Sequence, residues 1–463
     1  MKDWTQEPAH SIADAVRSGQ VTARLVAEQH LAAIARRNDL LKAYTDVTAE
    51  RALARADAID AARAQGQPLP PLAGVPFAVK NLFDVDGLVT RAGSKINRDH
   101  APAQQDATLI TRMEAAGAVL LGALNMGEYA YDFTGRNAHD GNSRNPHDTA
   151  RMTGGSSGGS GGAAAAGLAA ITLGSDTNGS IRVPASLCGL FGLKPSYGGL
   201  SRAGTFPFVA SLDHVGPLAR SVKDLALAYD AMRGADPLDP VCTAGTAAPV
   251  TPALDTGIKG LRIARAGGYF TRMGEAQAFA AVDLVARALG AEGSVEFPEA
   301  HRARAAAFII TMIEGSALHH DRIRARPADF DPEVRDRLIA GAMLPGDWYV
   351  KAQKFRRWFQ AEALKLFDGT DLILAPATPT SAPLVDQQTF VLDGQTLPVR
   401  PNLGIFTQPI SFIGLPVVTV PVWPEQGMPI GIQIIAAPGQ EALALRAANW
   451  LENQRIVHAK PAG

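Results

Sequence analysis

Residues 153–162, which read TGGSSGGSGG, form the stretch that most restricts how this chain can fold. A run of glycine and serine taken alone is typical of a flexible linker between two folded units. Here the run leads directly into the Ala-rich segment 161–168 and then into the apolar segment 170–173, so it does not separate two units. Because glycine permits positive φ angles and a close approach of the backbone to a ligand, we interpret the run as part of a ligand site.

Short apolar segments alternate with helical ones in the rest of the chain, which indicates an α/β fold. Residues 75–80 and 118–124 are short and mostly apolar, as expected for strands with both faces buried. Apolar residues at helical spacing and abundant alanine predict an N-terminal helical segment within residues 1–65. A second, mainly helical segment with many charges is expected at about residues 235–365, as an insertion in one α/β core.

The composition excludes several classes of function. The 463 residues are 46% hydrophobic, and Lys plus Arg number 44 against 45 for Asp plus Glu, so the net charge is -1. This balance gives no basic field for nucleic acid or for a membrane surface. Cys188 and Cys242 fit neither a disulfide framework nor a zinc motif, and the adjacent His319 and His320 are interpreted as surface or packing residues. No signal peptide or transmembrane helix is recognisable, so we expect a cytoplasmic protein without a metal.

Residues 174–186, which read GSDTNGSIRVPAS, begin where a predicted strand ends, and this is where α/β sheets place their ligand sites. Residues 177–180 are small and predict a tight turn, in which successive backbone N–H groups can point into one concavity. Such a turn meets the requirement of an oxyanion hole, where donors face the developing negative charge of a tetrahedral intermediate. A serine at its edge can then attack a carbonyl group, although the stretch taken alone also fits an ordinary polar loop.

Lys80 stands at the end of the apolar segment 75–80. A lysine that leaves a buried strand most often extends to solvent. If it is enclosed instead, loss of hydration lowers its pKa, and the neutral amine can act as a general base for a serine hydroxyl. Pairs of serine and lysine are a known variant of the Ser-His-Asp arrangement.

Taken together, these stretches resemble the amidase signature family. The similarity includes VPFAVKNLFDVDG around Lys80, MTGGSSGGSGGAAAAG around Ser156 and LGSDTNGSIRVPASLCGLFGLKPSYG around Ser180, in that order. It continues in DLILAPATPTSAP, GLPVVTVPV and GMPIGIQII and is weakest between about 235 and 365. The resemblance implies a single amidase domain over residues 1–463, with a central mixed β-sheet surrounded by helices and with no cofactor.

The same resemblance implies a role for each catalytic candidate. Ser180 would be the nucleophile that forms an acyl-enzyme. Ser156, on a cis peptide bond, would relay a proton. Lys80 would be the base that takes this proton and later helps to return it.

The oxyanion hole implied by the family consists of backbone N–H groups of the turn, including those of Thr177, Asn178 and Gly179. Asn178 departs from the glycine that is more usual at this position. Asn tolerates the left-handed conformation, and its side chain is a further candidate for contact with the substrate. Asp176 and Arg182 flank the turn, where we expect a structural ion pair.

The substrate is indicated by the loop 129–148, which is similar to a loop of the allophanate hydrolases, where an Arg and a Tyr hold a carboxylated urea. Arg136 and Tyr129 are the nearest matches, with Tyr131 as an alternative to Tyr129. A guanidinium suits a carboxylate, although a solvated or ion-paired arginine is the competing interpretation of Arg136. Gln408 is a further candidate for a polar contact.

More narrowly, TGRNAHDGNSRNPHD together with SDTNGSIRVPASLCG resembles the 1-carboxybiuret hydrolases of cyanuric acid catabolism. This implies hydrolysis of a terminal amide with release of ammonia. It also implies an oligomer with a small helical partner subunit like the C subunit of the tRNA-dependent amidotransferase. The alternatives are the glutaminase A subunit of glutamyl-tRNA amidotransferase and a noncatalytic scaffold on an amidase fold. Arg136 and Asn178 favour the carboxylated urea.

Overall fold

The computed structural model describes residues 2–243 and 248–462. Its strands are β1 (Tyr44–Val47), β2 (Pro76–Lys80), β3 (Val119–Leu124), β4 (Ile171–Asp176), β5 (Phe191–Lys194), β6 (His214–Ala219), β7 (Ile263–Ala266), β8 (Ser294–Val295), β9 (Leu372–Pro376), β10 (Thr389–Leu392), β11 (Gln395–Pro398), β12 (Val417–Val422) and β13 (Ile430–Ala436). Eleven of them form one mixed sheet in the order β1-β3-β2-β4-β6-β5-β12-β13-β9-β7-β8, while β10 and β11 form a separate hairpin.

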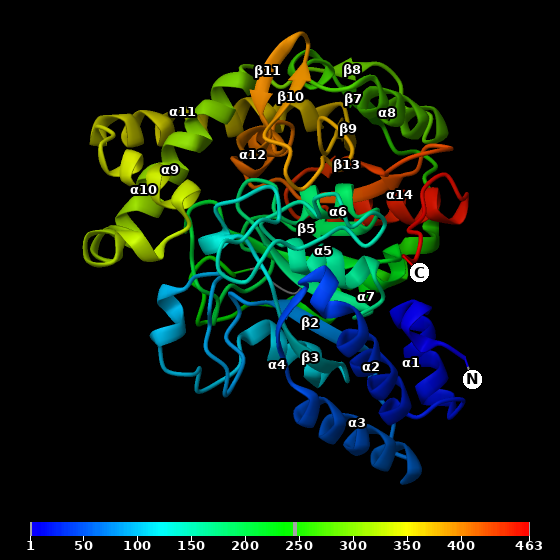
Figure 1. The fold of residues 1–463 in the computed structure, drawn as a ribbon. Helices are drawn as coiled ribbons and strands as arrows, with labels where there is room; N and C mark the ends of the chain where they lie inside the picture. The colour runs from blue at the N-terminus through cyan, green and yellow to red at the C-terminus, as the bar shows by residue number, and fades with distance from the viewer. Residues whose placement is uncertain (1, 244–247, 463) are drawn as a thin grey trace.

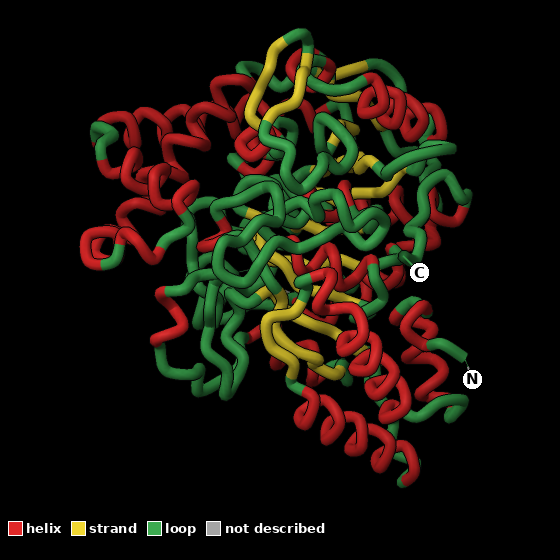
Figure 2. The backbone as a smooth tube through the Cα atoms, in the orientation of Figure 1, coloured by secondary structure: helices red, strands yellow, loops and turns green. Residues whose placement is uncertain are grey.

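Helices surround this sheet. They are α1 (Ala9–Ser18), α2 (Ala23–Leu41), α3 (Ala49–Ala64), α4 (Thr108–Ala115), α5 (Gly158–Ala165), α6 (Arg182–Leu187), α7 (Val222–Met232), α8 (Ala276–Ala288), α9 (Ala300–Ala325), α10 (Pro332–Ala342), α11 (Gly346–Lys365), α12 (Val399–Asn402), α13 (Gln408–Ser411) and α14 (Glu441–Asn453). Figure 1 shows α9, α10 and α11 together at one side of the molecule. In Figure 2 the strands lie inside and the helices outside, which confirms the expected mixed sheet surrounded by helices.

The N-terminal segment differs from the expectation in one respect. Helices α1, α2 and α3 account for most of it, but the strand β1 lies between α2 and α3 and pairs antiparallel with β3. Lys42 ends α2 in the left-handed conformation, with φ of 49°, and turns the chain into this edge strand. The strand was hidden because four residues are too few to interrupt a helical pattern visibly.

The segment expected as an insertion at about 235–365 is also more than a group of helices. It contributes β7 and β8 to one end of the main sheet, where β7 pairs parallel with β9. The helical unit proper is α9, α10 and α11, and α9 packs against both of the others. Residues 244–247 of the expected insertion lie outside the described residues.

The arrangement of β2 and β4 determines where the site lies. These two strands are fully buried and run parallel, with Val79 opposite Leu173. Parallel neighbours end at the same edge of a sheet. Lys80 at the end of β2 is therefore brought beside the last residues of β4 and the turn that follows them.

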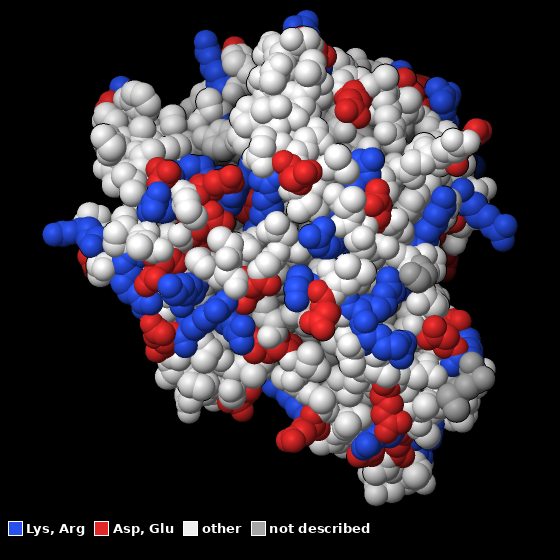
Figure 3. Space-filling model, in the orientation of Figure 1, with Lys and Arg blue, Asp and Glu red and all other residues white. Residues whose placement is uncertain are grey.

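Charges are mixed over the surface. On the face in Figure 3, Lys and Arg side chains are interspersed with Asp and Glu, in keeping with the net charge of -1. Across residues 2–243 and 248–462, no helix has both the length and the apolar character that a membrane crossing requires.

Candidate active site

Lys80 points into the protein and not into solvent, since it is 0% exposed. Its Nζ donates hydrogen bonds to Ser156 Oγ at 2.7 Å and to Ser175 Oγ at 2.8 Å. Ser175 lies in β4, beside the end of β2. The amine is thus held between one hydroxyl from the Gly/Ser-rich run and one from the neighbouring strand.

Burial changes the acid–base chemistry of this lysine. Loss of hydration lowers the pKa of Lys80 from 10.5 to about 7, because it disfavours the charged ammonium. The carboxylates of Asp213, Asp176 and Asp132 act in the opposite direction and prevent a larger shift. An amine with a pKa near 7 exists partly in its neutral form at neutral pH, as a general base requires.

The Gly/Ser-rich run is buried and closely packed. The peptide bond between Gly155 and Ser156 is cis, as the family resemblance implied. A Cβ on Gly155 would lie 2.6 Å from Asp132 Oδ2, and one on Gly159 would lie 2.5 Å from the backbone oxygens of two other segments. Glycine is needed here because the backbone itself fills the space, so the run does not act as a linker.

The turn that contains Ser180 is fixed by a buried ion pair. Arg182 donates to Asp176 through Nε and Nη2, both at 3.0 Å, and both side chains are 0% exposed. Burial alone would raise the pKa of Asp176, but the Arg182 guanidinium holds it well below its ordinary value. The Asp176 carboxylate also accepts from Ile181 N, so it ties together both ends of the turn. The expected structural ion pair is confirmed.

The backbone N–H groups of the turn are left without partners in the backbone of the described residues. Among the described residues, the N–H groups of Asn178, Gly179 and Ser180 have no backbone acceptor. Gly179 has φ of 142°, and a Cβ there would lie 2.1 Å from Thr407 Oγ1. Thr407 in turn donates to the carbonyl of Asn178 at 2.7 Å. This contact engages the carbonyl of Asn178, while the N–H donors of the turn remain available, as an oxyanion hole would require.

Ser180 lines a small cavity of about 20 Å³. The cavity is also lined by Thr177, Asn178, Tyr131, Arg337 and Gln408, among others. This volume holds about one water molecule.

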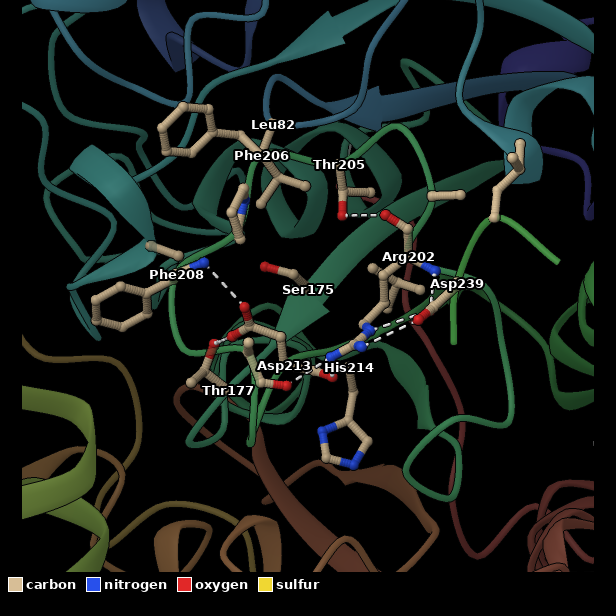
Figure 4. A pocket seen from close by; sticks show the side chains of 16 residues that line it. Leu82, Ser175, Thr177, Arg202, Thr205, Phe206, Phe208, Asp213, His214 and Asp239 are labelled. Carbon is tan, nitrogen blue, oxygen red and sulfur yellow. Dashed lines mark hydrogen bonds and ion pairs between the residues drawn. The ribbon is translucent and has the colours of Figure 1, made fainter. Parts of the chain in front are cut away.

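A larger hollow of about 170 Å³ has Ser175 in its lining (Figure 4). It shares Thr177 with the cavity at Ser180. Thr177 Oγ1 donates to Asp213 at 2.6 Å, and Asp213 also accepts the backbone N–H groups of Phe208 and Val209. Burial raises the pKa of the Asp213 carboxyl group. Asp213 thus anchors Thr177, the first residue of the turn, to the segment of Phe208 and Val209.

The structure does not bring Tyr129 and Arg136 into the cavity at Ser180. The Tyr129 hydroxyl donates to Asn97 Oδ1 at 3.0 Å, and its ring packs 3.9 Å from the ring of buried His319. The Arg136 guanidinium donates to the Val385 carbonyl at 2.9 and 2.6 Å and lines a separate outer hollow. Both side chains point away from the cavity, because Asn97 and His319 hold Tyr129 and the Val385 carbonyl holds Arg136.

Three residues that contact Lys80 or line the cavity at Ser180 were not singled out from the sequence, namely Ser175, Arg337 and Thr311. Ser175 had a recognisable signal, since it stands at the end of a strand that was predicted to lie in the same sheet as Lys80. Arg337 and Thr311 had none, because they are ordinary residues of the helices α10 and α9. Tyr131, the alternative to Tyr129, does line the cavity.

The described part of the chain contains no group of three His, Cys, Asp or Glu side chains placed to hold a metal ion. The groups gathered at the site are one amine, several hydroxyls and backbone N–H donors. These are the components of nucleophilic acyl transfer.

Comparisons with known proteins agree with this chemistry. The sequence model of the family described as Amidase matches residues 26–445. The chain is 55% identical to the AtzE chain of the 1-carboxybiuret hydrolase of Pseudomonas sp. (strain ADP) over 451 residues, which are 97% of this chain and 99% of that protein. It is 35% identical to the A subunit of the glutamyl-tRNA(Gln) amidotransferase of Koribacter versatilis (strain Ellin345), covering 95% of this chain and 96% of that one.

Solved structures of amidases are also similar to this chain. A structure described as a vestigial protein complex that reveals the origins of an s-triazine catabolic enzyme has a TM-score of 0.97 and 54% identity, covering 98% of this chain and 100% of that chain. A bacterial aryl acylamidase of the amidase signature family has a TM-score of 0.89 and 25% identity, covering 97% and 96%. The chain therefore belongs to the amidase signature family and is a hydrolase that acts on amide C–N bonds.

Proposed function

We propose that this protein hydrolyses the terminal amide of a small carboxylated urea of the 1-carboxybiuret type, through an acyl-enzyme on Ser180, and releases ammonia. The observation that supports the chemistry most is the hydrogen bond of 2.7 Å between the buried amine of Lys80 and the hydroxyl of Ser156. The substrate class is supported by the 55% identity to a chain of a 1-carboxybiuret hydrolase over almost the whole sequence.

In the first half of the reaction, the Ser180 hydroxyl gives its proton through Ser156 to neutral Lys80 as its oxygen attacks the amide carbon. The N–H groups of residues 177–180 stabilise the negative oxygen that forms. The C–N bond then breaks, and the nitrogen receives the proton back through Ser156 and leaves as ammonia. When Lys80 is neutral, its amine can donate to Ser175 Oγ, which lies 2.8 Å away, and accept the proton of Ser156 with its lone pair.

In the second half, a water molecule gives a proton to the same relay and attacks the acyl carbon. The bond between this carbon and the Ser180 oxygen breaks, and the oxygen recovers the proton. The carboxylic acid product is released, so atoms and protons balance over the cycle.

The proposal is tested by measuring ammonia release from carboxylated ureas by the purified chain. We expect Ser180→Ala and Lys80→Ala to abolish release while circular dichroism shows an intact fold. Half-buried Ser381 lies outside the site, and Ser381→Ala is the matched control that should keep the activity. Quenched turnover should give an acyl adduct on the peptide with Ser180. Unchanged hydrolysis in either site variant would contradict the mechanism.

The glutaminase alternative has weaker support, because the amidotransferase A subunits share about a third of their residues with this chain. Ammonia release from glutamine, compared with release from a carboxylated urea under the same conditions, separates the two functions. A higher kcat/KM for glutamine would favour the alternative. The noncatalytic scaffold is not supported, because the chain is a hydrolase by its family and its relatives.

We also propose a small helical partner subunit, an oligomeric state and a cytoplasmic location. The partner is supported by relatives that are described as subunits and by a similar structure described as a protein complex. Native mass spectrometry of the protein from its own cells should show a second, smaller chain beside the 48.6 kDa one. A mass of this chain alone, or its presence in the membrane fraction, would contradict these proposals.

A further inference from the structure

The short helix α13 contacts the turn of Ser180 at two points. Thr407, the residue just before this helix, donates from Oγ1 to the carbonyl of Asn178 at 2.7 Å. Ser411, at the end of the helix, donates from Oγ to the Asp176 carboxylate at 3.0 Å. Side chains four residues apart lie on the same face of a helix. One face of α13 therefore contacts both the carbonyl of the turn and the buried carboxylate that fixes it.

The proton of the Thr407 hydroxyl is directed to Asn178. The carbonyl of Gly404 lies at a similar distance from Thr407 Oγ1, 3.0 Å, but it already accepts the backbone N–H groups of Thr407 and Gln408. No backbone N–H of the described residues donates to the carbonyl of Asn178. A hydroxyl has one proton to donate, and a buried carbonyl is costly to leave unpaired. The hydrogen bond of 2.7 Å to Asn178 is therefore the one that the structure requires.

This bond also fixes an N–H group, because the carbonyl of Asn178 and the N–H of Gly179 belong to one peptide group. The cis peptide bond of the chain lies elsewhere, before Ser156, so this peptide is trans and its C=O and N–H point in opposite directions. Asn178 and Ser180 line the cavity, whereas Thr407 is not part of its lining. A carbonyl held toward Thr407 thus turns the Gly179 N–H to the side of the cavity.

Thr407 is itself held rigidly. It is 0% exposed, and a Cβ on Gly179 would lie 2.1 Å from its Oγ1 and 2.7 Å from its Cβ. The next residue, Gln408, accepts from Arg304 of α9 at 2.8 Å, which ties α13 to the long helix. Only glycine allows the turn to approach Thr407 so closely, so the hydroxyl and the peptide are matched to each other.

We propose that Thr407 is a positioning residue for acyl transfer. Its hydroxyl holds the carbonyl of Asn178 so that the N–H of Gly179 faces the oxygen that becomes negative when Ser180 attacks. The inference rests on the proposed function, because it requires Ser180 as the nucleophile. Thr407 touches the turn and not the substrate. A donor aimed at charge that develops only in the transition state changes the rate and not the binding of substrate, so the loss of Thr407 should lower kcat.

The inference is tested by the second-order rate at which a fluorophosphonate labels Ser180 in the full chain. The phosphoryl oxygen of this reagent gains negative charge during the attack, so the rate depends on the same N–H donors. Thr407→Val keeps the shape of the side chain and removes the hydroxyl, and it should slow labelling about 10- to 100-fold. Thr407→Ser keeps the hydroxyl and should stay within about threefold of the unmodified protein.

Thr419→Val is the matched control. Thr419 lies in β12, is 0% exposed, and its Oγ1 has no hydrogen-bond partner among the described residues. The same substitution there removes a buried hydroxyl without breaking a contact, so the labelling rate should not change. The pH at which labelling is half-maximal should stay near 7 in Thr407→Val, because Lys80 is untouched. With a carboxylated urea, kcat should fall by the same factor as labelling, while KM changes less than about threefold.

A labelling rate in Thr407→Val within about threefold of the unmodified protein would overturn the inference. So would an equal loss in Thr407→Ser or in Thr419→Val, or a loss that appears only in KM. The serine variant decides alone if the valine variant does not fold, since slow labelling would assign the effect to the methyl group and normal labelling to the hydroxyl. Normal labelling of Ser180 without ammonia release from carboxylated ureas would instead overturn the proposed function.

Discussion

The buried amine of Lys80 makes the pH dependence of Ser180 reactivity the sharpest test of the mechanism. The base must be neutral to accept a proton, and the pKa of Lys80 is about 7. The neutral fraction then rises from about 9% at pH 6 to about 91% at pH 8, so the rate should rise about tenfold and level off. A lysine with the ordinary pKa of about 10.4 would give about a 100-fold rise of the rate from pH 6 to pH 8, and the rate would not level off below about pH 10.

The assay is the second-order rate at which a fluorophosphonate labels Ser180 between pH 5.5 and 9. This reagent has no ionisable group in that range, so the profile reports the enzyme. Lys80→Met should give a slow rate with no dependence on pH in this range. Lys194 is the matched control, because it is also buried and burial also lowers its pKa to about 7, while its Nζ donates to the Pro195 carbonyl.

The fall of the labelling rate below pH 7, which we call the acid limb, should therefore remain in Lys194→Met and disappear in Lys80→Met. A profile that is flat in the unmodified protein, or one that keeps rising to pH 9, would refute the role of a buried amine. So would an acid limb that follows Lys194 instead of Lys80.

The lowered pKa of Lys80 also affects the stability of the fold. The pKa of Lys80 is lower in the folded protein than its ordinary value of 10.5, so the unfolded chain binds more protons between about pH 7 and 10.5. The free energy of unfolding should then rise with pH through this window, by at most about 5 kcal/mol. Lys80→Met removes the free-energy cost of burying a charged or deprotonated amine. In urea denaturation the variant should therefore be more stable than the unmodified protein, most clearly below pH 7. A difference that is the same at pH 6 and pH 10 would contradict this reasoning.

Three further substitutions test the surroundings of the turn. Arg182→Met leaves the buried carboxylate of Asp176 unpaired and should lower the free energy of unfolding by about 3–5 kcal/mol in urea denaturation; a loss below about 1 kcal/mol would contradict the structural role of the pair. Gly179→Ala places a Cβ 2.1 Å from Thr407 Oγ1 at a residue with a positive φ. The turn should be displaced, so kcat should fall at least about 100-fold. A kcat within about threefold of the unmodified protein would show that the N–H groups are not positioned as described. Arg136→Ala should change KM less than about threefold, equally for carboxylated and neutral amides, because backbone carbonyls occupy its guanidinium; a selective loss for carboxylated substrates would return Arg136 to the site.

The strands β2, β3 and β4, and the position of Lys80 at the end of β2, could be predicted from the sequence. The strands β2, β3 and β4 are buried on both faces, so each appears as a continuous apolar run with a clear end. The Gly/Ser-rich run could be separated from a linker because an apolar helix and strand follow it directly. The short strands β1, β7 and β8 at the two ends of the sheet had local patterns too weak to detect, and the longer inner strands β6 and β13 were not predicted either.

The sequence by itself indicated the type of chemistry, because the stretches around Lys80, Ser156 and Ser180 are local motifs whose resemblance to the amidase signature family is visible without a structure. Only the tertiary structure decided the pKa of Lys80 and the lining of the cavity. A pKa depends on how completely other segments enclose the amine, and the lining depends on the direction in which each side chain points. Tyr129 and Tyr131 are two residues apart, yet the first packs against His319 of α9 and the second lines the cavity at Ser180, where Arg337 of α10 packs on its ring.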